Sequence, residues 1–194
     1  MAYTAAIALL EFGSIAAGIE AGDAMVKRAA LDVIHTGTVH PGKYLVLIGG
    51  TVGDVEEALD AALMVSADHV VDRLFLPDPH PQLITALQGT REPGDGEALG
   101  IIETVSVAAA IRAADAGLKG ALVTLREIFL ADGLGGKGYL LFGGPLVEVE
   151  AAVGYGTARA QGAVVGFRVI AQLHGEMDEN LVADGQFAAR VRTS

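Results

Sequence analysis

The sequence AIALLEFGSIAAGIEAGDAMVKRA at residues 6–29 returns in altered form as ALGIIETVSVAAAIRAADAGLKGA at residues 98–121. At this offset, 11 of the 24 aligned positions are identical, whereas two alanine-rich segments would share roughly 2–4 by chance. Five of the other 13 positions exchange one aliphatic side chain for another, as in Ile7/Leu99 and Ile15/Val107. The chain therefore contains an internal repeat, too long for a solenoid unit and of the right size for a small domain.

The repeat continues beyond this stretch with an offset larger by two residues. Gly42-Lys43 then matches Gly136-Lys137, and His80 matches His174. The second copy must therefore carry a two-residue insertion between Ala121 and Gly136, most simply in a loop. We expect one domain over residues 1–90, a second over 97–180 and a C-terminal tail over 181–194. The linker, 88–98, is rich in Gly, Pro and charge.

Composition narrows the classes of function. With 52% apolar residues, 5% aromatic residues and no Trp, the core must be built from Val, Ile, Leu and Ala, which leaves little room for internal cavities. A net charge of −11 argues against nucleic acid and anionic membranes as partners. No apolar run is long enough for a transmembrane span, and no basic segment suggests a signal peptide. The high mean hydropathy of +0.46 instead favours subunit interfaces.

Periodicity and turn residues predict the same element order in both copies. In the first, we expect a strand at Tyr3–Phe12, a helix capped by Ser14, and strands at Leu31–Thr36 and Tyr44–Ile48, the latter ended by Gly49-Gly50. A helix at Val52–Val65, a strand at Val70–Leu76 and a short helix at Gln82–Leu87 follow. The order β-α-β-β-α-β plus a short helix predicts two tandem ferredoxin-like domains of the α/β (α+β) class.

The sequence offers little catalytic chemistry. The absence of Cys excludes thiolate catalysis, Cys-type zinc sites and Cys-ligated iron–sulfur clusters. The segment Gly133–Gly138 lacks the spacing of a phosphate loop, so we expect a tight connection there. No nucleophile–base pair or paired carboxylates stand out, so we do not expect an enzyme. A ligand-binding or enzymatic ferredoxin-like protein remains an alternative, but it would need a deep pocket with a perturbed ionisable group.

Several polar side chains recur in both copies. Glu11 and Glu103 lie at the strand-to-helix corner, where we expect them to accept helix N-terminal amides. His80 and His174 each begin a short helix, which favours a capping or packing role. His40 differs, because the neighbouring Pro41 would hold it outward in a loop. The pairs Asp23–Lys27 and Asp115–Lys119 have the spacing of ion pairs on a helix surface.

Taken in order, these motifs resemble the bacterial microcompartment (BMC) shell domain. The resemblance rests on Leu10-Glu11, Ser14-Ile15-Ala16-x-Gly18, Asp23-Ala24-Met25-x-Lys27, His40-Pro41-Gly42-Lys43, Gly49-Gly50-x-Val52-Gly53 and Pro77-x-Pro79-His80. The second copy, with Gly100–Ala109 and Gly135-Gly136-Lys137, resembles the second domain of the tandem, trimer-forming class. Within that class the propanediol-utilisation type is the most similar. The resemblance covers about residues 4 to 177.

This resemblance implies a structural protein of a microcompartment shell in the bacterial cytoplasm. Three chains would close into a flat pseudohexagonal tile that meets other shell proteins, both hexamers and pentamers. Small metabolites would pass a central pore lined by Val39, His40, Pro41, Leu134, Gly135 and Gly136. Lys27 and Lys119 match the family's tile-edge lysines, and we also expect Asp78, His80 and His174 at the edge. The family's edge arginine between prolines is replaced by Asp78 in one copy and Gln172 in the other.

The resemblance also bears on cofactors. In the propanediol-utilisation type, a cysteine at the position of His40 holds an iron–sulfur cluster on the threefold axis, and this chain has no cysteine. We therefore expect no such cluster. Three His40 imidazoles on the axis suit a metal-binding, electron-relay shell protein, since three-His sets are known metal ligands. They equally suit a pore whose charge depends on pH.

Overall fold

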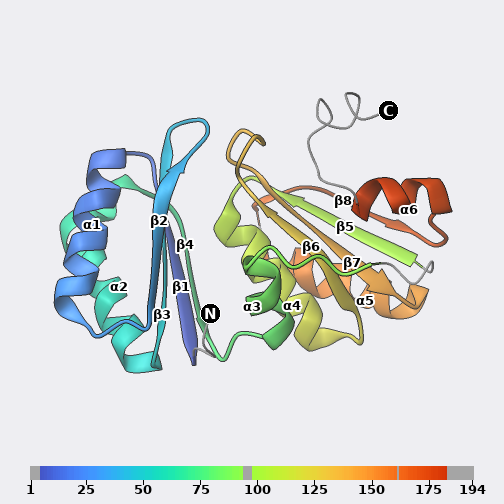
Figure 1. Cartoon of the computed structure of the whole chain (residues 1–194), viewed down its shortest axis with the longest axis horizontal. Coiled ribbons are helices and arrows are strands. Elements are labelled where there is room, and N and C mark those ends of the chain that lie inside the picture. Colours follow the sequence, from blue (N-terminus) through green and yellow to red (C-terminus); the bar gives the residue numbers. More distant parts are fainter. Residues whose placement is uncertain (1–4, 94–97, 161, 183–194) are drawn as a thin grey trace.

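The computed structural model describes residues 5–93, 98–160 and 162–182, which form two domains, each with one four-stranded sheet (Figure 1). Both sheets are antiparallel, with orders β2-β3-β1-β4 and β6-β7-β5-β8. The predicted α/β class and ferredoxin-like order are confirmed. Within these described ranges, no helix combines the length and the apolar character needed to cross a membrane.

The first domain follows the predicted order of elements. Its elements are β1 (Ala6–Phe12), α1 (Ile15–Arg28), β2 (Val33–Val39), β3 (Lys43–Gly50), α2 (Val52–Ser66), the 3₁₀ turn η1 (Ala67–His69), β4 (Val70–Pro77) and α3 (Pro81–Leu87). Helix α1 begins where the Ser14 hydroxyl accepts from the amide of Ala17, and Thr51 caps α2 in the same way.

The second domain repeats this order. Its elements are β5 (Ala98–Thr104), α4 (Val107–Gly120), β6 (Thr124–Leu130), β7 (Gly138–Gly144), α5 (Leu146–Arg159), β8 (Val164–Ile170) and α6 (Gly175–Val182). Ser106 caps α4 through the amide of Ala109. The predicted domain limits remain predictions. Helix α6 extends to Val182, and the rest of the predicted tail lies outside the described residues.

Strand pairing places the two-residue insertion and corrects two predicted strands. Val39 pairs with Lys43 across three residues, whereas the amide of Ala131 donates to the carbonyl of Lys137 across five. The insertion is therefore in the β6–β7 turn. The expected end of a strand at Gly49-Gly50 is wrong, because both glycines pair with β1. Strand β2 also lies later than predicted, because its register with β3 runs from Val33 to Val39.

The two faces of the first sheet pack against different domains. Its inner face, with Leu10, Phe12 and Val46, forms a core with the chain's own α1 and α2. Its other face, with Ile7 and Leu9, belongs to the apolar cluster of the second domain. Figure 1 shows α1 and α2 on one side of this sheet, with α3, α4 and the second domain on the other. The second domain thus completes the core of the first.

Candidate functional site

Helices α1 and α4 are repeat copies with similar apolar side chains in different surroundings. The stripe on α4 is buried in the joint between the domains: Val107 is 0% exposed, Ile111 0% and Leu118 6%. The same stripe on α1 faces solvent: Ile15 is 41% exposed, Ile19 55% and Val26 47%. The chain therefore covers this face in one copy and leaves it open in the other.

Glu11 lies at the centre of the domain joint. Its side chain is fully buried, and Oε1 accepts from the amide of Ala108, 2.7 Å away at the N-terminus of α4. Oε2 pairs with Lys43 Nζ at 3.1 Å. Burial raises the pKa of the Glu11 carboxyl above its ordinary 4.5, against the opposing effects of the Ala108 amide and of Lys43. Glu11 accepts a helix N-terminal amide as predicted, but the helix belongs to the other domain.

A second polar cluster in the joint was missed by the sequence analysis. Arg112 Nη2 on α4 lies 3.3 Å from Asp72 Oδ1 and donates to the Arg73 carbonyl at 2.6 Å. The Ser106 hydroxyl donates to the other oxygen of Asp72. Neither Asp72 nor Arg112 recurs at its repeat position, so the internal comparison gave no signal for them. They hold β4 of one domain to α4 of the next.

Glu103 does not do in the second domain what Glu11 does in the first. It is 40% exposed and pairs with Lys137 Nζ at 2.7 Å. The expectation of two equal surface ion pairs is also wrong for the second copy. Asp23–Lys27 (2.5 Å) is exposed, but Asp115 is buried and accepts from the His80 amide at 2.9 Å as well as pairing with Lys119 at 2.7 Å. The two ion pairs differ because Asp115 is buried in the joint between the domains, whereas Asp23 faces solvent.

The expected pore residues lie in two neighbouring turns. Val39 ends β2, and His40 and Pro41 follow in the exposed β2–β3 turn. Leu134, Gly135 and Gly136 lie in the β6–β7 turn, where Gly135 and Gly136 take positive φ values of 64° and 83°. A Cβ placed on Gly136 would lie 3.3 Å from Pro41 Cδ. Each chain therefore brings its two turns together at the same end of the molecule (Figure 1).

The expected edge residues are spread over several elements. Lys27 and Lys119 lie near the C-terminal ends of α1 and α4. His80 and His174 cap α3 and α6, since each Nδ1 accepts from an amide two residues later, at 3.2 and 3.3 Å, which confirms the capping role. Asp78 has φ of 58° and donates its amide to the Ala5 carbonyl at 2.8 Å, so it shapes the turn before α3.

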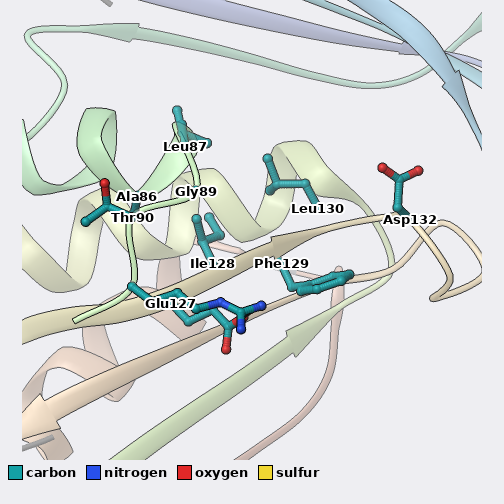
Figure 2. A pocket seen from close by; sticks show the side chains of 10 residues that line it. Ala86, Leu87, Gly89, Thr90, Glu127, Ile128, Phe129, Leu130 and Asp132 are labelled. Carbon is teal, nitrogen blue, oxygen red and sulfur yellow. The ribbon is translucent and has the colours of Figure 1, made fainter. Parts of the chain in front are cut away.

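A cavity of about 270 Å³ lies where the segment after α3 crosses β6 (Figure 2). Leu87 and Ile128 line it together with Thr90 and Glu127, and Figure 2 shows Asp132 at one end. Arg91 and Glu127 both line it and form an ion pair at 2.8 Å. It is an open recess between two packed elements, and Glu11, whose carboxyl has a raised pKa, does not line it.

The comparisons with known proteins agree with this architecture. The model of the BMC domain family matches residues 6–79 and again residues 98–173. The chain is 40% identical over 179 residues to the bacterial microcompartment shell protein PduT of Citrobacter freundii, covering 91% of this chain and 97% of that protein.

Two solved structures are also similar. A microcompartment protein from Desulfitobacterium hafniense superposes with a TM-score of 0.79 at 40% identity, over 90% of this chain and 98% of that one. A fused permuted hexameric shell protein of the RMM microcompartment shares the fold at 18% identity, with a TM-score of 0.58 over 80% and 83%. The chain belongs to the bacterial microcompartment shell protein family and carries two BMC domains in tandem.

Proposed function

We propose that three copies of this chain close into a six-domain tile of a microcompartment shell, with a pore on the threefold axis. One observation carries the proposal: the apolar stripe of α1 is exposed, while the matching stripe of α4 is buried against the neighbouring domain. Burying a large aliphatic side chain contributes about 1.5–3 kcal/mol. A second copy that covers α1 as the first domain covers α4 would recover this free energy.

The joint inside the chain is heterologous, because the helix face of one domain meets the sheet face of the other. Repeated head to tail, such a joint produces a closed ring or an open filament. Membership of the shell-protein family favours the closed ring. Because each chain carries two domains, three chains would supply the six domains of the tile. The ring would gather the paired β2–β3 and β6–β7 turns of every copy around its axis, with Val39, His40, Pro41, Leu134, Gly135 and Gly136 as the pore lining.

In a shell of the bacterial cytoplasm, the pore would pass small metabolites, and the rim would meet other tiles. Lys27 and Lys119 are the edge residues we propose. Both lie near helix C-termini, and each keeps an acidic partner one turn earlier. Asp78 is held in its turn by the Ala5 carbonyl, so we assign it a part in edge shape rather than a direct contact.

A metal at His40 is the second candidate function. His40 is exposed in the β2–β3 turn, but within residues 5–93, 98–160 and 162–182 no three His, Asp or Glu side chains of one chain could hold a metal ion. A metal would therefore need several copies. Metal analysis of the untagged protein tests this function. About one metal ion per three chains, lost in the variant His40→Ala, would support the electron relay. Metal-free wild-type protein would reject it.

The tile itself is tested by electron microscopy of the purified protein concentrated into sheets. We expect a hexagonal lattice whose units have threefold symmetry and a central hole. The variant Ile19→Glu should form no lattice, because it places a carboxylate in the proposed joint. Met64→Glu is the matched control, since Met64 is exposed and its counterpart Ala158 stays exposed. Discrete single chains in the wild-type sample would contradict the proposal.

A further inference from the structure

Helix α3 fills a groove in the second domain, between α4 and β6 (Figure 1). Its Leu83 and Ile84 are buried in one apolar cluster with Ile111 and Leu125. Two hydrogen bonds fix its position: the His80 amide donates to Asp115, and Gln82 Oε1 accepts from the Leu125 amide at 3.0 Å. The first domain thus extends its last helix onto the second.

The same groove in the first domain is open. A cavity of about 280 Å³ lies between α1 and β2, and six of its lining residues are Gly18, Ile19, Gly22, Asp23, Val26 and Ile34. The repeat alignment and strand register give their counterparts beneath α3, which are all buried: Ala110, Ile111, Ala114, Asp115, Leu118 and Leu125. The groove therefore lacks the helix that its copy holds.

Helix α6 is the repeat copy of α3. The equal capping by His80 and His174 fixes the register, so that Met177 and Leu181 take the places of Leu83 and Leu87. Met177 is 54% exposed. Figure 1 shows α6 on the far side of the second domain from the first. The groove of its own chain is therefore out of reach, and a second copy of the chain is the natural partner.

We propose that α6 of one copy docks in the groove between α1 and β2 of the next. In the same joint, Glu103 would accept the Ala16 amide at the start of that α1, as Glu11 accepts the Ala108 amide. The pair Glu103–Lys137 repeats Glu11–Lys43. This joint rests on the proposed three-chain tile and identifies its contact surfaces.

Some contacts of the joint within the chain have no counterpart between chains. Gly166 stands at the position of Asp72, and Glu20 at that of Arg112. The joint between chains would therefore lack counterparts of the Asp72–Arg112 ion pair and of the hydrogen bond from Ser106 to Asp72. Asp178 replaces the buried Ile84 and pairs instead with Arg126 of its own chain at 2.6 Å. The joint between chains is therefore the weaker of the two, and the tile separates into chains before the domains of a chain separate.

The experiment uses the natural absence of cysteine. Ile34→Cys and Glu176→Cys are introduced together, because their counterparts Leu125 and Gln82 are in direct contact. The mass of the untreated variant is first measured by light scattering, and a short bismaleimide is then added. Asp60→Cys with Glu176→Cys is the control, since Asp60 is exposed on α2 outside the groove.

We expect a mass of three chains, and covalent dimers and trimers on a denaturing gel from the Ile34/Glu176 pair only. A mass of three chains with no cross-linking above the control would overturn this joint and leave the tile standing. A single-chain mass would overturn both. The joint is also wrong if the two pairs cross-link equally well.

Discussion

At the scale of single residues, Glu11 and Glu103 show how position decides chemistry. Glu11 lies on β1 and Glu103 on its repeat copy β5. Glu11 pairs with Lys43 at the start of β3, and Glu103 pairs with Lys137 just before β7. Glu11 is fully buried because a second domain covers it, and it satisfies the Ala108 amide of that domain. Glu103 lacks such a cover within the chain. Glu11 is thus a residue of the domain joint rather than a member of an active site.

The role of Glu11 in the joint predicts a large effect of its removal. Glu11→Ala leaves the Ala108 amide and Lys43 without their buried partner, so the free energy of unfolding should fall by about 2 kcal/mol or more. Glu103→Ala should change it by about 0.5 kcal/mol or less, because an exposed ion pair contributes little. Urea unfolding measures both, in an Ile19→Glu background that should prevent the proposed association. Equal losses of unfolding free energy in the two variants would contradict the role of Glu11 in the domain joint.

The raised pKa of Glu11 predicts a dependence of stability on pH. Between pH 4.5 and the raised value, the folded chain keeps a proton that the unfolded chain has lost, so stability falls as pH rises through this window. Above the raised pKa, this group adds no further slope. Glu11→Gln should remove the slope while keeping an acceptor for the Ala108 amide. Urea unfolding from about pH 4 to about pH 8 tests it, and an unchanged slope would refute the assignment.

At the scale of elements, local signals predicted most of the fold. Ser14 caps its helix as expected, Ser106 repeats this cap in the second copy, and the element order follows from periodicity. Sequence could not show that the stripe of Ile15, Ile19 and Val26 stays open while its copy is buried. The two stripes have almost the same residues, and only tertiary contact separates them. Sequence also could not predict the ion pair between Asp72 and Arg112. The two residues are distant in sequence, and neither recurs at the equivalent position of the other copy.

The close approach of α4 and α5 depends on glycine, which gives a matched pair of substitutions in one helix. A Cβ on Gly156 would lie 2.7 Å from Ile102 Cδ1 and 3.0 Å from the Ala113 carbonyl oxygen, whereas a Cβ on Gly154 meets nothing within 4 Å. We expect Gly156→Ala to cost about 1–3 kcal/mol through overpacking. Gly154→Ala should stabilise by about 0.5–1 kcal/mol through helix propensity. Thermal unfolding compares them, and shifts of the same sign would contradict the packing.

At the scale of the whole molecule, the chain has one joint that is filled and one that is open. The second domain covers one face of the first, the groove beside α1 is open at one end of the chain, and Met177 of α6 is exposed at the other. Duplication explains this arrangement, since each copy kept both surfaces. The turns differ between the copies, with His40-Pro41 in one and Gly135-Gly136 in the other, so the proposed pore would have two unlike halves.

The mass of the protein in solution tests the proposed tile most directly. One chain has a mass of 19.9 kDa, so sedimentation equilibrium should give about 60 kDa for three chains. The variant Ile19→Glu should shift the mass towards 19.9 kDa, because it places a carboxylate in the proposed joint between chains. A wild-type mass of 19.9 kDa at every concentration would contradict the closure of three chains into a tile.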